Sequence, residues 1–126
     1  MNAVIDSSAV IALILQEEGA AAVAAFVAGA SISAVNYAEV LEVLGRRGMD
    51  ASLAHSAFAS LGIEIAPFDA VHARRTAALA PVTRHLGLSL GDRACLAVAE
   101  QRGVSAITAD RRWAEAGVNI KVTLIR

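Results

Sequence analysis

The chain has 126 residues, of which 56% are hydrophobic and 18% charged, with a formal net charge of -1. This length suits one domain over residues 1–126, and the high apolar content excludes an intrinsically disordered chain. The charge excludes a strongly basic nucleic-acid-binding protein, and aromatic residues, at 4%, are too few for a surface that stacks bases.

The sequence also indicates the compartment. Cys95 is the only cysteine, so an internal disulfide is excluded, which is typical of a reducing environment. The apolar N-terminal segment has no basic region and is interrupted by Asp6, which argues against a signal peptide. The longest apolar stretch is shorter than the roughly 20 residues of a membrane-spanning helix. We therefore expect a cytoplasmic protein that does not contact a membrane.

Short apolar runs alternate with helical patterns along the chain. Strands are predicted at residues 3–6, 30–34, 63–68, 104–108 and 119–125. Helices are predicted at residues 7–15, 17–29, 35–48, 50–62, 69–80, 90–103 and 110–117, with Pro81 interrupting or restarting the fifth. This alternation predicts right-handed crossovers between parallel strands. The expected fold is α/β, a three-layer α/β/α sandwich with a mostly parallel central sheet.

The aspartates are the first candidate functional residues. All five stand at predicted helix starts, where Asp is a favoured N-cap: Asp6, Asp50, Asp69, Asp92 and Asp110. Capping alone accounts for any one of them. Asp6 and Asp110 each end a strand-like run beside hydroxyl residues, however, and Asp92 follows a glycine that permits close approach. Carboxylates that converge at strand ends repel one another unless a divalent cation such as Mg²⁺ or Mn²⁺ lies between them.

Glu39 and Glu42 are further candidates. They stand three residues apart on one face of the predicted helix 35–48, away from its main apolar stripe. A solvated helix face explains both, and their spacing does not distinguish one from the other.

Four segments together resemble a known family. "VIDSSAVIAL", "NYAEVLEVL", "LSLGDRACLAVA" and "AITADRRW" occur in this order, and the chain resembles a PIN domain over nearly its whole length. It is most similar to VapC-type toxin ribonucleases of bacterial toxin–antitoxin pairs. The resemblance implies an acidic set of Asp6, Glu39, Asp92 and Asp110, and thus selects Glu39 over Glu42. It also implies that the first and fourth strands are neighbours in the sheet.

The resemblance implies a metal-dependent endoribonuclease that hydrolyses RNA phosphodiester bonds with Mg²⁺ or Mn²⁺. Asp6 and Asp92 are expected to bind the metal directly, and Glu39 and Asp110 to complete the site. Ser7 and Thr108 are expected to support the acids through hydrogen bonds.

Substrate and partner contacts follow from the same resemblance. Arg93, Arg111 and Arg112 adjoin the acids and are candidates for RNA phosphate binding, although such arginines are also typical of solvated surface. A VapC-type toxin is expected to form a homodimer and to bind a cognate antitoxin protein. The Ala-rich segment 19–29 could supply a surface for either contact, with burial in the domain's own core as the default.

Other functions fit the sequence less well. A Mg²⁺-dependent phosphatase with an aspartyl nucleophile requires an acid two residues after Asp6, where this chain has Ser8. A receiver-type phosphotransfer domain requires an acid pair before the phosphorylated Asp and a lysine after the last strands, and the only lysine is Lys121, inside a predicted strand. A non-catalytic PIN-like module that binds RNA or protein remains the main alternative, which the presence of four acids disfavours.

Overall fold

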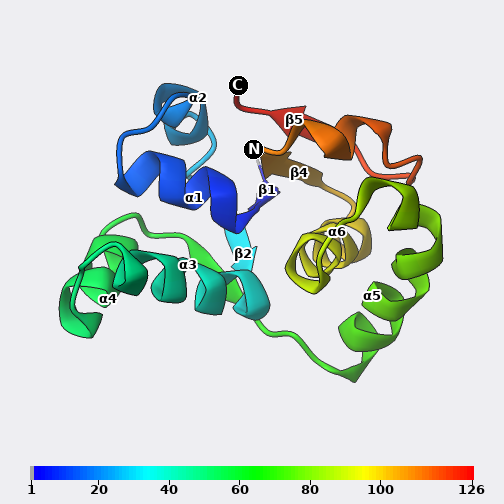
Figure 1. Cartoon of the computed structure of the whole chain (residues 1–126), viewed down its shortest axis with the longest axis horizontal. Helices are drawn as coiled ribbons and strands as arrows, with labels where there is room; N and C mark the ends of the chain where they lie inside the picture. The colour runs from blue at the N-terminus through cyan, green and yellow to red at the C-terminus, as the bar shows by residue number, and fades with distance from the viewer. Residues whose placement is uncertain (1) are drawn as a thin grey trace.

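The computed structural model describes residues 2–126 (Figure 1). Within them the strands are β1 Ala3–Ile5, β2 Ser31–Ser33, β3 Glu64–Ala66, β4 Ser105–Thr108 and β5 Val122–Leu124. The α-helices are α1 Ser7–Ile14, α2 Ala20–Ala24, α3 Ala34–Arg46, α4 Ala51–Ala59, α5 Ala70–Thr83 and α6 Leu90–Arg102. Two short 3₁₀ helices are η1 Arg84–Leu86 and η2 Arg111–Glu115.

The strands form one sheet in the order β3-β2-β1-β4-β5, and every neighbouring pair is parallel. Ile5 of β1 pairs with Ile107 of β4, so the first and fourth strands are neighbours, as expected. Strand order reverses between these two strands. In open parallel sheets this switch point is where crossovers leave in opposite directions and open a crevice beyond the carboxyl ends.

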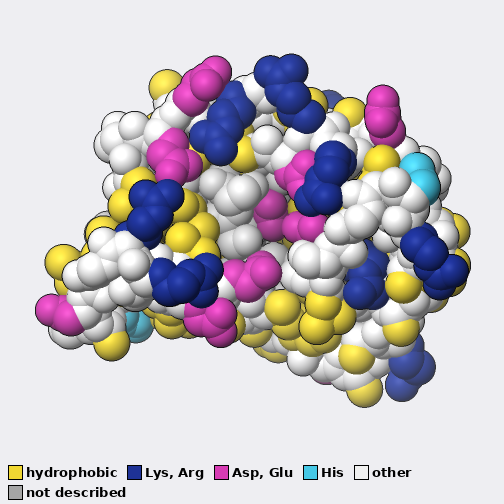
Figure 2. All heavy atoms as spheres, viewed as in Figure 1, with side chains coloured by type: hydrophobic (Ala, Val, Ile, Leu, Met, Phe, Trp, Pro, Cys, Tyr) yellow, Lys and Arg dark blue, Asp and Glu magenta, His cyan; other side chains and the backbone are white. Residues whose placement is uncertain are grey.

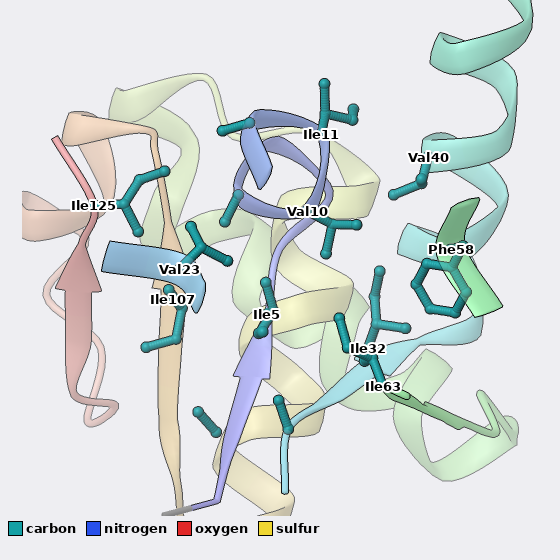
Figure 3. Packing of buried hydrophobic residues seen from close by; sticks show 14 of the residues in the cluster. Ile5, Val10, Ile11, Val23, Ile32, Val40, Phe58, Ile63, Ile107 and Ile125 are labelled. Atoms are coloured by element: carbon teal, nitrogen blue, oxygen red, sulfur yellow. The ribbon is translucent and has the colours of Figure 1, made fainter. Parts of the chain in front are cut away.

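Helices cover both faces of the sheet, which confirms the three-layer α/β/α prediction. Successive residues of a strand point to opposite faces. Ile5, Ile32 and Ile107 pack with residues of α1, α2, α3 and α4 on one face (Figure 3). Val4 and Ala106, each one residue earlier in its strand, pack with α5 and α6 on the other face. The two apolar layers fix the sheet between the helices and so fix the positions of the strand ends.

The predicted helix at residues 17–29 is wrong in extent, because only Ala20–Ala24 are helical. Gly19 has φ of +94°, and a Cβ there would lie 2.7 Å from the carbonyl oxygen of Ile125. The chain therefore turns tightly at Gly19, in a left-handed conformation that few residues other than glycine adopt. Of the short helix that follows, only Val23 is buried.

Pro81 does not interrupt or restart a helix, contrary to the expectation from the sequence. α5 continues through Pro81 to Thr83. A proline removes one backbone donor, whose usual acceptor would be the carbonyl four residues earlier. That residue, Ala77, is exposed, so water can replace the missing partner. Among the described residues, no helix has the length and apolar character that crossing a membrane requires.

Candidate functional site

Four acidic residues lie at the carboxyl-terminal end of the sheet. Asp6 directly follows β1, Asp110 follows β4 by two residues, Glu39 lies on α3, and Asp92 lies in the first turn of α6. Figure 2 shows acidic side chains gathered in a hollow at the middle of one face, with Lys and Arg side chains around it. The fold thus brings together at the switch point residues that are up to about a hundred positions apart in sequence.

Asp6 is the buried centre of this group, with 2% of its surface exposed. Its Oδ2 accepts hydrogen bonds from the hydroxyls of Ser8, at 2.7 Å, and Thr108, at 2.9 Å. Its backbone N–H donates to the carbonyl of Ile107, at 2.8 Å, which holds the end of β1 against β4. Burial raises the pKa of Asp6 from 3.8 to about 6, with a further contribution from the negative charges of Asp92 and Glu39.

Glu39 is held beside Asp6. The Ser7 hydroxyl lies 3.1 Å from Glu39 Oε1 and 3.5 Å from Asp6 Oδ1, so it bridges the two carboxylates. The amide nitrogen of Asn36 donates both to Glu39 Oε1 and to the carbonyl of Gly91, each at 2.9 Å. Gly91 leaves the room for this arrangement, because a Cβ there would overlap the Glu39 carboxylate. Close packing of α3 on α6 therefore positions Glu39.

Asp92 has a structural role as well as its place in the site. It is the third residue of α6, where Ser89 is the N-cap. Asp92 Oδ2 accepts from the backbone N–H of Ser89 at 2.8 Å, and the Ser89 hydroxyl accepts from the Asp92 N–H at 3.2 Å. This reciprocal capping box fixes the first turn of the helix and points Asp92 toward the acidic group.

Asp110 is paired with Arg112, two residues later in the chain. The Nε of Arg112 lies 3.0 and 3.1 Å from the two Asp110 carboxylate oxygens, and Nη2 lies 2.6 Å from Oδ2. These hydrogen bonds lower the pKa of Asp110. Arg112 Nη2 also lies 3.8 Å from Asp92 Oδ2, so one guanidinium faces two acids of the site.

The four acids are thus arranged as two pairs, Asp6 with Glu39 through Ser7, and Asp92 with Asp110 through Arg112. Among residues 2–126, no three His, Cys, Asp or Glu side chains converge closely enough to share a metal ion as they stand. Their chemistry nevertheless fits a hard divalent cation, because the donors are carboxylate oxygens. The central donor, Asp6, is destabilised in its charged form by burial and then by its acidic neighbours.

The other predicted residues fall into two groups. Thr108 and Ser7 hydrogen-bond to the acids, as described above. Arg93 is half-buried and donates from Nη1 to the Thr76 carbonyl at 2.9 Å, so it links α6 to α5. Arg111 is exposed beside Arg112. All three arginines are close to an acid in the sequence. In the folded structure, only Arg112 forms ion pairs with the acids of the site.

Two residues that the sequence analysis did not assign contribute to the site. Ser8 donates to Asp6 and accepts from the backbone N–H of Ala109 at 3.1 Å, so it joins the loops after β1 and β4. The two serines after Asp6 are evident in the sequence. Which of them donates the shorter hydrogen bond to Asp6 depends on how α1 begins, which the sequence does not show. Asn36 is fully buried, and its spacing of three residues before Glu39 was the only signal that the two share a helix face.

Glu42 and the remaining aspartates lie outside the site. Glu42 is exposed on α3, whereas Glu39 is half-buried. Asp50 and Asp69 accept hydrogen bonds from the backbone N–H groups of Leu53 and His72 and cap α4 and α5.

Two open cavities of about 490 and 510 Å³ lie at the opposite end of the sheet, beside Asn2 and the strand starts, so the acids line neither.

Comparison with known proteins identifies the family. The PIN domain family model matches residues 3–119, so the chain is a member of the PIN domain family. A search of curated proteins found no match. Among solved structures, a toxin–antitoxin complex from Klebsiella pneumoniae matches with a TM-score of 0.74 and 22% identity over 98% of each chain.

Two structures from Mycobacterium tuberculosis are also similar. VapC20, a toxin that cleaves the sarcin–ricin loop, matches with a TM-score of 0.75 and 19% identity, covering 94% of this chain and 98% of that chain. VapBC-5, from a toxin–antitoxin system, matches with a TM-score of 0.61 and 25% identity over 99% of this chain and 98% of that chain. The PIN fold therefore extends along the described chain.

Proposed function

We propose that this PIN domain is a metal-dependent endoribonuclease that hydrolyses RNA phosphodiester bonds and acts as the toxin of a toxin–antitoxin pair. The observation that carries the proposal is the gathering of Asp6, Glu39, Asp92 and Asp110 at the switch point of the sheet. Asp110 caps the short helix η2 and Asp92 takes part in the capping box of α6, but the Asp6 side chain makes no capping hydrogen bond and lies deeply buried near other acids.

In this proposal Asp6 and Asp92 hold a Mg²⁺ or Mn²⁺ ion, and Glu39 and Asp110 complete the site. The ion, when bound, would lower the pKa of a water molecule and stabilise charge on the phosphate. Ser8 and Thr108 orient the Asp6 carboxylate, and Asn36 orients that of Glu39. Hydrogen bonds of this kind fix the direction in which a ligating oxygen points.

RNA binding requires positive charge near the acids. Arg111 is exposed and directly follows Asp110, so it is the arginine best placed to contact phosphate. Arg93 is bonded to the Thr76 carbonyl, and Arg112 is paired with Asp110. In this proposal each contacts phosphate only after it leaves that partner. Arginine suits this role because its guanidinium donates two parallel hydrogen bonds to one phosphate.

The partners are proposed by similarity. Several structurally similar proteins come from VapBC or FitAB toxin–antitoxin pairs, and some of those complexes were solved with DNA. We propose that this chain likewise binds a cognate antitoxin, and that it forms a homodimer and acts in the cytoplasm as one folded domain over residues 1–126.

The proposal is tested by incubating the purified protein with end-labelled RNA in the presence of Mg²⁺ or Mn²⁺. We expect cleavage that EDTA abolishes. We expect Asp6→Asn and Asp92→Asn to reduce the rate by roughly a hundredfold or more, because each removes a metal-binding carboxylate.

α3 supplies a matched control pair. Glu39→Gln is expected to reduce cleavage, whereas Glu42→Gln, three residues later on an exposed face, is expected to retain the wild-type rate. Wild-type cleavage by Asp6→Asn and Asp92→Asn would contradict the assignment of the site. Equal losses from Glu39→Gln and Glu42→Gln would contradict the selection of Glu39.

One observation favours a second candidate, a PIN-like module that binds RNA or protein without cleaving it. Arg112 already neutralises charge at Asp110 and Asp92, so the acids are partly balanced without a metal. The same assay separates the two functions. A binding module would retain RNA on a filter with full affinity in EDTA and would yield no cleaved ends with either ion.

A further inference from the structure

Arg112 is held more firmly than a surface arginine. Besides its hydrogen bonds to Asp110, its Nη1 donates to the carbonyl of Leu86 at 2.9 Å and lies 3.4 Å from that of Gly87. These carbonyls belong to the end of η1, where backbone oxygens lack partners within the helix. The guanidinium is therefore fixed by a carboxylate on one side and by carbonyl oxygens on the other, although about half of the side chain remains exposed.

The place that Arg112 occupies is one that suits a cation. It lies between Asp110 and Asp92, which come from different segments and would repel each other if left unbalanced. Each ion pair with Arg112 occupies a carboxylate oxygen, which is the kind of donor that a hard divalent ion prefers. Asp92 Oδ2, which faces Arg112, is also the oxygen that accepts from the Ser89 N–H, so this carboxylate is already shared.

We infer that Arg112 is an internal counter-ion that competes with the divalent cation for Asp110 and Asp92, and so sets the metal affinity of the site. This inference rests on the proposed function, since it assumes that the acids bind a metal. Full coordination then requires the Arg112 side chain to leave Asp110. The released guanidinium would be free to contact an RNA phosphate, so metal binding and substrate binding would be coupled through one side chain.

The neighbouring residue supplies a control. Arg111 carries the same charge one position earlier and is exposed. Within residues 2–126 it forms no ion pair, whereas Arg112 forms two. Removing either arginine lowers the net positive charge of this segment by the same amount. A larger effect at Arg112 than at Arg111 therefore reports the close contact of Arg112 with Asp110 and Asp92.

The test measures Mn²⁺ binding without RNA by isothermal titration calorimetry, using wild type, Arg112→Met and Arg111→Met. Methionine keeps an unbranched side chain while removing the charge. We expect Arg112→Met to bind Mn²⁺ roughly threefold to tenfold more tightly than wild type, a modest gain because the ion pair is half exposed. Arg111→Met is expected to stay within about a factor of two.

Arg112→Lys is the second variant and keeps the charge. A lysine does not reproduce the forked contact with both Asp110 oxygens, so we expect an affinity between those of wild type and Arg112→Met. Equal affinities for Arg112→Met and Arg111→Met, or weaker binding by Arg112→Met, would overturn the inference and leave the proposed function intact. Absence of Mn²⁺ binding in all four proteins would contradict both.

Discussion

Asp6 is a buried carboxylate whose charge lowers the stability of the fold. Its carboxyl is buried, and burial raises its pKa to about 6. In the unfolded chain the same group loses its proton near its ordinary value of 3.8. Between these two values the folded state binds more protons than the unfolded state, so stability falls as the pH rises from about 4 to 6. Above that range the cost of the buried charge is constant.

This cost predicts that Asp6→Asn stabilises the protein when no metal is present. Asparagine keeps an oxygen that can accept from Ser8 and Thr108 but carries no charge. From the shift in the Asp6 pKa we expect a gain of about 1–3 kcal/mol in the free energy of unfolding at pH 7.5, disappearing toward pH 4. Urea unfolding in EDTA at several pH values measures it.

Asp50→Asn is the control for this experiment. It also removes a carboxylate from a helix start, but at an exposed cap, where asparagine serves equally well. A similar gain in both variants, or a gain for Asp6→Asn that does not depend on pH, would contradict the pKa argument.

Asn36 is expected to act through Glu39. Asn36→Ala removes the donor shared by Glu39 and the Gly91 carbonyl, so we expect it to destabilise the fold by roughly 1–3 kcal/mol and to weaken Mn²⁺ binding. In a Glu39→Gln background, Asn36→Ala should have no further effect on Mn²⁺ affinity. A double-mutant cycle measures this coupling. Additive losses of affinity would show that Asn36 acts independently of Glu39.

At the scale of elements, the contact between α3 and α6 joins packing to the site. Gly91 lies in the first turn of α6, against the Glu39 carboxylate from α3. Gly91→Ala introduces a methyl group whose three nearest atoms all belong to the end of the Glu39 side chain. Alanine is favoured over glycine within a helix by up to about 1 kcal/mol. The fold should therefore tolerate the change while the site does not.

We expect Gly91→Ala to leave the melting temperature unchanged or slightly raised, and to reduce RNA cleavage and Mn²⁺ affinity as Glu39→Gln does. Differential scanning calorimetry measures the melting temperature, and the RNA cleavage assay and the Mn²⁺ titration measure the other two effects. Gly45→Ala is a matched control, because a Cβ at Gly45 of α3 meets nothing within 4 Å. Full activity of Gly91→Ala would show that the position of the Glu39 carboxylate is not critical.

The elements also show why the site was only partly predictable from sequence. Strand ends located Asp6 and Asp110 because polar residues that follow apolar runs stand out in any sequence. The choice of Glu39 over Glu42 needed the family resemblance, since both occupy one helix face. The contacts of Asn36 and Arg112 depend on segments that approach only after folding, Gly91 for one and η1 for the other.

At the scale of the whole molecule, the alternation of apolar runs and helical patterns predicted the layers and the parallel sheet. The prediction was wrong where a local pattern competed with tertiary packing. The Ala-rich segment after Glu17 has high helix propensity, yet Gly19 packs against Ile125, and the chain turns there. The contact of Gly19 with Ile125 joins distant segments and is not encoded in neighbouring residues. Pro81 was expected to interrupt or restart a helix, but the exposed last turn of α5 tolerates it, which is a local effect.

The pairing of β1 with β4 has a consequence for how activity arises during folding. Ile5 lies beside Ile107, and Thr108 reaches Asp6 across 102 positions of sequence. Contacts between such distant segments form late, because a long loop must close before they are made. The four acids come from separate segments that meet only when the chain has folded. If the chain is the nuclease proposed above, its activity would therefore appear only after β4 has paired with β1.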